Sequence, residues 1–224
     1  MDLHDLSPWL DQFRAGLLQA FGPELVFLGI QGSYARGEAT PRSDIDVVVI
    51  LEQLTKEAAG RYRALLDTLP RREQVCGFVS SRAVLSGWDG GDRFQFYYDT
   101  VPLLGRLEDL FPVPGREEAH QALHTGACGL YHACCHNLLH ARDPQVLAGL
   151  CKTAAFSLQA LHFLRTGTYV RRRADLLPLL PPEDRAILEG RALAEGLSTG
   201  AETDFDALSQ RLLDWAAGHI AAGA

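Results

Sequence analysis

The feature that constrains this chain most is a change of sequence pattern around residue 112. Before that point, short apolar runs alternate with segments whose apolar residues recur at helical spacing. After it, every patterned segment has helical spacing. The change falls at Phe111–Gly115 (F-P-V-P-G), where two prolines interrupt any regular helix or central strand. The sequence therefore predicts two domains, residues 1–112 and residues 113–224.

The first predicted domain combines strands and helices. Its apolar, β-branched runs are typical of buried strands, and its amphipathic segments end at glycine or proline, as helices commonly do. Strands separated by helices imply an α/β sheet covered by helices. The predicted helices are Trp9–Phe21 and Leu54–Leu69, and the predicted strands are Leu25–Ile30, Asp44–Leu51, Gln74–Ser80 and Phe94–Val101.

The second predicted domain is all-α. Proline and acidic residues open one of its helices at Pro182, as a first helical turn prefers. Successive helices joined by short connections favour an antiparallel bundle. The predicted helices are about Glu117–His140, Pro144–Arg165, Arg173–Leu180, Pro182–Ala194 and Thr203–Ala222.

Composition and net charge limit the classes of partner that the chain is expected to bind. The chain has 224 residues and a net charge of −7, whereas proteins that hold a polynucleotide backbone usually carry a basic excess. We therefore expect no polynucleotide partner, and an acidic surface would suit a small cationic molecule better. The five cysteines form no CxxC pair, the N-terminus is acidic, and no run of about 18 apolar residues stands out. These features predict a cytoplasmic protein without a membrane partner, and they leave a homodimer open.

A candidate phosphate site follows the first predicted strand. The segment Gly29–Val47 reads G-I-Q-G-S-Y-A-R-G-E-A-T-P-R-S-D-I-D-V. Glycine at Gly32 lets the backbone approach a phosphate, and the amides of a following helix start can hold it. Ser33 adds a hydroxyl group, and Arg36 and Arg42 add guanidinium donors suited to phosphate oxygens.

Two aspartates open the next predicted strand. Asp44 and Asp46 are two residues apart, so strand alternation places both carboxylates on one face while Ile45 and Val47 point to the core. Neighbouring carboxylates repel each other and need a compensating cation. Magnesium is the natural choice, because it binds one or two carboxylates together with substrate phosphates. Two such ions would clamp the attacking and leaving oxygens of a phosphoryl transfer.

Each of these short motifs alone is more typical of an ordinary turn or strand edge, so the prediction rests on their combination. In that combination the segment resembles the nucleotidyltransferase superfamily that includes DNA polymerase β, kanamycin nucleotidyltransferase and the small MNT-type proteins. The family pattern is a hydrophobic-Gly-Ser turn, about ten residues, and then Asp-hydrophobic-Asp. The form G-S-Y-A-R-G-E-A followed by S-D-I-D-V is similar to the bacterial branch, whose antibiotic-modifying members also carry a C-terminal helical domain.

The resemblance implies an α+β domain with a mixed nucleotidyltransferase sheet, followed by a helical bundle. It also implies a Mg-dependent enzyme that transfers a nucleoside monophosphate from an NTP, with ATP favoured, to a hydroxyl of a small acceptor. An aminoglycoside-like antibiotic is the expected acceptor class, with a protein hydroxyl as the other option. The implied catalytic and metal-binding residues are Asp44 and Asp46, and the implied nucleotide-binding residues are Gly32, Ser33, Arg36 and Arg42.

The third carboxylate of the family pattern is missing from its expected strand. The predicted strand places Cys76 at that position, and a protonated thiol is a poor magnesium ligand and an inferior base. Asp99 or, with a shifted register, Glu73 could replace it, and Glu117 or Glu118 could act on the acceptor side. The alternative function is a nucleotide-binding regulatory or antitoxin-like module with little or no turnover.

Two further patterns are weaker. Six residues recur every four positions along one predicted helix, but that spacing drifts by about 40° per step, so they cannot all face one ion. Histidines lining a seam between helices are therefore favoured over a metal site. The basic run Arg171–Arg173 is interpreted as a solvated turn, with phosphate contact as the alternative. The six residues are His120, His124, Cys128, His132, His136 and His140.

Overall fold

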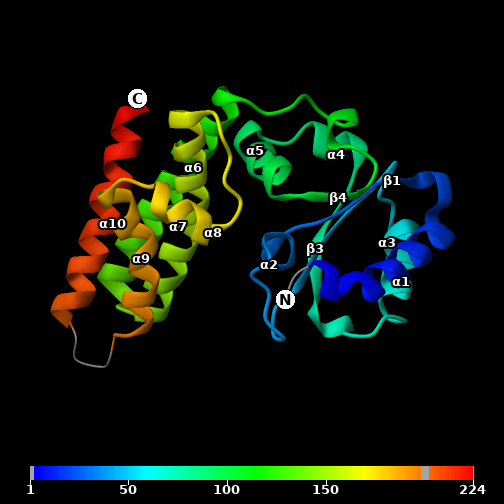
Figure 1. The fold of residues 1–224 in the computed structure, drawn as a ribbon, viewed down its shortest axis with the longest axis horizontal. Coiled ribbons are helices and arrows are strands. Elements are labelled where there is room, and N and C mark those ends of the chain that lie inside the picture. Colours follow the sequence, from blue (N-terminus) through cyan, green and yellow to red (C-terminus); the bar gives the residue numbers. More distant parts are fainter. Residues whose placement is uncertain (1–2, 198–201, 224) are drawn as a thin grey trace. The chain divides into compact units, whose positions relative to one another are not determined.

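The computed structural model describes residues 3–197 and 202–223, which fold as two compact units (Figure 1). The first unit comprises Met1–Asp89 and Phe96–Val113, and the second comprises Gly90–Gln95 and Pro114–Ala224. These units differ from the predicted domains at two places: the short stretch Gly90–Gln95 belongs with the helical unit, and Val113 belongs with the first unit.

A four-stranded mixed sheet forms the centre of the first unit. Its strands are β1 (Leu25–Ile30), β2 (Ile45–Leu51), β3 (Val75–Ser81) and β4 (Val101–Leu104), in the order β3-β2-β1-β4. Strand β1 is antiparallel to β2 and to β4, whereas β2 and β3 are parallel. The mixed sheet with its helices confirms the predicted α+β fold.

Both faces of this sheet are covered by apolar side chains. Along β2, Val47 and Val49 pack into one core with residues of α1 (Leu3–Phe21) and α3 (Lys56–Leu66), while Val48 and Ile50 pack into a second core on the opposite face. The burial of alternate residues on opposite faces explains the unbroken apolar run of β2. Shorter elements complete the unit: η1 (Gly22–Glu24), α2 (Gly32–Arg36), η2 (Arg72–Gln74), α4 (Arg82–Ser86) and η3 (Leu107–Asp109).

The predicted strand Phe94–Val101 is wrong. These residues mostly lie in helix α5 (Gly90–Asp99), and β4 begins only at Val101. Phe94 packs against Phe163 with ring centroids 5.0 Å apart within the second unit, whereas Phe96 packs against Phe78 at 5.2 Å within the first. Phe94 and Phe96 are therefore both buried although they are two residues apart. This spacing is typical of a strand, but the backbone here is helical.

The second unit is an antiparallel helical bundle, as predicted. Its long helices pack against one another along their lengths (Figure 1). The elements are α6 (Arg116–His136), a π-helical turn at Asn137–Ala141, α7 (Pro144–Thr166), α8 (Arg173–Leu176), η5 (Leu177–Leu179), α9 (Pro182–Glu195) and α10 (Glu202–Ala222).

Helix α7 is the core helix of this bundle. Among the described residues it is the one helix long and apolar enough for a membrane span, which the sequence analysis did not expect. However, 67% of its most apolar window is buried inside the protein, as in the central helix of a bundle. Its apolar length is thus explained by burial against α6 and α9.

A buried carboxylate ties α7, α9 and α10 together. Asp184 is 1% exposed, and its Oδ1 accepts a hydrogen bond of 2.8 Å from Trp215 Nε1. Its Oδ2 forms an ion pair with Arg165. A cavity of about 810 Å³ between α9 and α10 opens beside this cluster, and it also contacts His219. Burial lowers the pKa of His219, so this imidazole stays neutral beside Trp215.

We predict that Asp184→Ala lowers the free energy of unfolding by about 2–3 kcal/mol, because Trp215 Nε1 and the Arg165 guanidinium lose a charged partner. Asp175→Ala is the matched control, since Asp175 is exposed and its ion pair with Arg172 spans 3.7 Å at the surface. We expect about 0.5 kcal/mol or less there. Denaturant unfolding followed by circular dichroism measures both, and equal losses would contradict a stabilising role for the buried carboxylate.

Candidate active site

The end of β1 and the start of β2 meet at a contact that only glycine permits. Strand β1 ends at Ile30, paired with Val47, and Gln31 N donates to Asp46 O at 2.8 Å. Gly32 follows with φ +68°, and a Cβ at this position would lie 1.8 Å from Asp46 Oδ2. The Asp46 carboxylate therefore lies directly against the backbone of the predicted phosphate turn.

The other predicted site residues lie on the same segment. Ser33 is in α2, directly after Gly32, and its carbonyl oxygen accepts a hydrogen bond of 2.8 Å from Glu38 N. Asp44 is exposed and lies just before β2, two residues from the half-buried Asp46. Arg42 is exposed in the turn between α2 and β2. The roles predicted for these residues remain predictions, but all of them lie between the end of β1 and the start of β2.

Strand β3 brings a thiol beside Asp46. The parallel register pairs Cys76 with Asp46 and Gly77 with Val47, so Cys76 occupies the neighbouring position on the same face. Gly77 has φ +124°, and a Cβ there would lie 2.0 Å from Val47 O, so the two backbones pack too closely for another residue. Glu73 lies in η2, ahead of the strand. The register therefore does not bring Glu73 beside Asp46.

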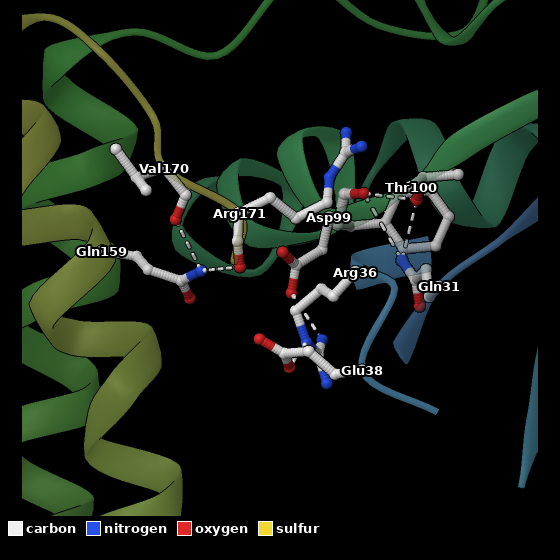
Figure 2. A network of polar contacts seen from close by, with 9 residues as sticks. Gln31, Arg36, Glu38, Asp99, Thr100, Gln159, Val170 and Arg171 are labelled. Atoms are coloured by element: carbon white, nitrogen blue, oxygen red, sulfur yellow. Dashed lines mark hydrogen bonds and ion pairs between the residues drawn. The ribbon is translucent and has the colours of Figure 1, made fainter. Parts of the chain in front are cut away.

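Arg36 is held between two carboxylates (Figure 2). Its Nε donates to Glu38 Oε2 at 3.0 Å, and its Nη1 lies 3.8 Å from Asp99 Oδ2. The side chain of Arg36 is 10% exposed and that of Asp99 is 7% exposed. The Arg36 guanidinium, which the sequence analysis assigned to phosphate binding, thus already contacts two carboxylates of the protein. Glu38 was missed at that stage, although the G-E-A part of the motif could have indicated it.

Helix α2 is also anchored from its other side. Tyr34 is 1% exposed within the core that includes α1 and α3, and its hydroxyl accepts a 2.7 Å hydrogen bond from Arg71 Nη2. The five residues of α2 are too few to form a stable isolated helix. Tertiary contacts through Tyr34 and Arg36 must therefore fix the Gly32–Ser33 turn.

The donor set at this edge fits a hard divalent cation. Two carboxylates, one lying against the backbone of Gly32, offer the oxygen ligands that Mg²⁺ prefers. Two carboxylates with no third acid on β3 would leave further coordination positions to nucleotide phosphates and water. We infer that Asp44 and Asp46 are the residues that would hold such an ion.

The histidine row does not form a metal centre. Within residues 3–197 and 202–223, no three His, Cys, Asp or Glu side chains are close enough to hold a metal ion. His136 and His140 instead contact each other, with ring centroids 4.8 Å apart. Burial raises the pKa of the Cys134 and Cys151 thiols to about 11, so these cysteines act as inert core residues.

The basic run lies at the end of a loop of the helical unit and at the start of α8. Gln159 is 1% exposed, and its Nε2 donates to the carbonyl oxygens of Val170 and Arg171, both at 2.9 Å (Figure 2). Arg173 places its guanidinium 5.7 Å from the centre of the Phe156 ring. This loop is therefore fixed by the core of the bundle.

Glu118 Oε2 accepts a hydrogen bond from Gly115 N, which gives that predicted acceptor-side acid a capping role.

Comparisons with known proteins now identify the class. The family model for the nucleotidyltransferase domain matches residues 10–118. The "Putative protein adenylyltransferase MJ1305" of Methanocaldococcus jannaschii is 40% identical over 136 residues, covering 50% of this chain and 91% of that protein. The chain belongs to the nucleotidyltransferase family and is an enzyme of that type.

A solved structure shows the same two-part fold. The spectinomycin adenyltransferase AAD(9) from Enterococcus faecialis, solved with ATP and spectinomycin, matches with a TM-score of 0.54 and 14% identity. The match covers 92% of this chain and 98% of that chain. The predicted nucleotidyltransferase sheet followed by a helical part is therefore confirmed as a fold.

We predict that Gly32→Ala weakens binding of Mg-ATP at least tenfold, because its Cβ would displace the Asp46 carboxylate. Gly37→Ala is the matched control. Gly37 has φ +69°, so alanine there has the same backbone cost of about 1–2 kcal/mol, but its Cβ would meet no atom within 4 Å. Isothermal titration calorimetry distinguishes them, and equal losses of affinity would show that backbone strain, not the Asp46 contact, is responsible.

Proposed function

We propose that this enzyme transfers an adenylyl group from Mg-ATP to a hydroxyl group of a small cationic acceptor of the aminoglycoside class. The observation that carries the proposal is the contact of the Asp46 carboxylate with Gly32, which places an acid that could bind a cation directly against the backbone of the turn at the start of α2. ATP is chosen because the relative and the solved structure are both named adenylyl- or adenyltransferases. The net charge of −7 favours a cationic acceptor.

The proposed reaction needs positioning and charge compensation more than covalent chemistry by the protein. The acceptor oxygen attacks the α-phosphorus, the bond from that phosphorus to the bridging oxygen breaks, and pyrophosphate leaves. The hydroxyl proton passes to a base. Asp44 and Asp46 would hold the magnesium, which supplies positive charge beside the phosphates. Gly32 and Ser33 would receive the β- and γ-phosphates, and the exposed Arg42 would neutralise them further.

A protein hydroxyl is the second acceptor class, since the named relative is a protein adenylyltransferase. The cytoplasmic location and the homodimer stay predictions. The regulatory module without turnover is the less favoured alternative, because the relative that shows the family is named as an adenylyltransferase.

The first test is pyrophosphate release. We expect release that requires ATP, Mg²⁺ or Mn²⁺ and an acceptor from a panel of aminoglycosides and spectinomycin, and that disappears in Asp46→Asn. A parallel reaction with ATP labelled at the α-phosphate and a protein mixture detects labelled protein. Release with the panel supports the small acceptor, and labelling of protein alone replaces it with a protein hydroxyl. Binding of Mg-ATP without any product would favour the regulatory alternative.

Cys76 gives a second test at the same site. We predict that Cys76→Asp raises kcat by about tenfold or more, because a carboxylate would then stand beside Asp46, where the family pattern places its third acid. Without metal, the added charge should lower the thermal midpoint by like-charge repulsion, and Mg²⁺ should restore it. Cys76→Ser keeps the size without the charge and should match the native rate. An unchanged rate in Cys76→Asp would show that the missing carboxylate does not limit turnover.

A further inference from the structure

The Asp99 carboxylate is a buried charge that the reaction described above does not use. Asp99 is the last residue of α5, two residues before β4, and its side chain is 7% exposed. An ionised carboxylate in such surroundings is costly unless a cation compensates it. In the first unit the Arg36 guanidinium is in a position to do so, with Nη1 3.8 Å from Asp99 Oδ2.

The sheet register brings Asp99 to the same end of β1 as the candidate site. Strand β4 is antiparallel to β1 with Val101 opposite Ile30, so the residues before Val101 run alongside those that follow Ile30. The hydrogen bond from Gln31 Nε2 to Thr100 Oγ1, 2.8 Å long, shows this neighbourhood directly (Figure 2). Gln31 N also donates to Asp46 O, so one residue links both neighbours of β1.

Arg36 connects this carboxylate to the phosphate turn. It is the last residue of α2, which begins at Gly32, and Glu38 takes its Nε. Because the guanidinium is mostly buried and shared between two acids, its direction is fixed by them. Tyr34 fixes the opposite side of α2 in the core. Removal of Asp99 would leave α2 anchored by Tyr34 and by a guanidinium with one carboxylate.

We propose that Asp99 is a positioning residue of the nucleotidyl-transfer site, which acts through Arg36 to hold the Gly32–Ser33 turn against Asp46. This inference rests on the proposed function, because the role it gives Asp99 is to position the Gly32–Ser33 turn for nucleotidyl transfer. It differs from the role of a third metal ligand in one measurable way: the effect of Asp99 must pass through Arg36.

A double-mutant cycle tests this dependence. Native protein, Asp99→Asn, Arg36→Met and the double variant are compared by calorimetric Kd for Mg-ATP and by kcat. We expect Asp99→Asn to raise Kd about tenfold, Arg36→Met to raise it at least as much, and the double variant to be no weaker than Arg36→Met. Glu38→Gln should shift Kd in the same direction, because it frees the same guanidinium.

The matched control is another ion pair of the first unit. Arg61 Nη2 lies 2.8 Å from Glu24 Oε2, and both side chains are more than 40% exposed. Glu24→Gln should leave Kd unchanged. Thermal midpoints of all variants detect any general loss of folding.

Several outcomes would overturn the inference. Losses that add in the double variant would show that Asp99 acts independently of Arg36, as a direct ligand would. An Asp99→Asn variant with a lower thermal midpoint but the native Kd and kcat would show a purely structural ion pair. If the native protein itself binds no Mg-ATP, the proposed function fails first. If the native protein and Asp99→Asn bind Mg-ATP and turn over equally well, the inference fails while the proposed function stands.

Discussion

The contact between Gly32 and the Asp46 carboxylate is the constraint on which the rest of the candidate site depends. It requires β1 and β2 to be antiparallel neighbours, so that the chain leaving β1 passes the side chain that enters β2. It also requires a residue without Cβ in a left-handed conformation, because any side chain would occupy the space of Asp46 Oδ2. The sheet therefore determines where the acid and the turn meet, and glycine permits that closeness.

The same sheet explains why the acids stand where they do. Val47 and Val49 fill one core and Val48 and Ile50 the other, so β2 can tolerate a carboxylate only where it leaves the cores. Asp46 is half-buried at that end, and Asp44 lies beyond it in solvent. A charged residue two positions further along β2 would have no solvent and no compensating partner. The spacing of the acidic pair thus follows from the end of the apolar strand.

The sequence was most informative where one physical rule governs a segment. Buried strands such as Leu25–Ile30 and amphipathic helices such as the predicted Trp9–Phe21 follow from periodicity, and the side-by-side placement of Cys76 and Asp46 follows from strand register. It failed at Phe94–Asp99, where two packing environments bury residues two apart in a helix. Periodicity indicates a helix when its buried residues all face one partner surface. In α5, Phe94 and Phe96 pack against two different partners. The contact of Arg36 with Asp99 could not be predicted either, because it joins residues 63 positions apart.

Charge accounting gives the candidate site its last constraint. Glu38 and Asp99 both contact the Arg36 guanidinium, and Asp44 and Asp46 lie close by along the chain. Neighbouring carboxylates such as Asp44 and Asp46 repel each other, so a cation stabilises the pair. In the proposed reaction, a magnesium nucleotide would supply that cation together with phosphates for the Gly32–Ser33 turn. Arg36 then serves better as a fixed internal cation than as a mobile phosphate ligand, because moving it to a phosphate would break its contacts with two carboxylates beside the turn.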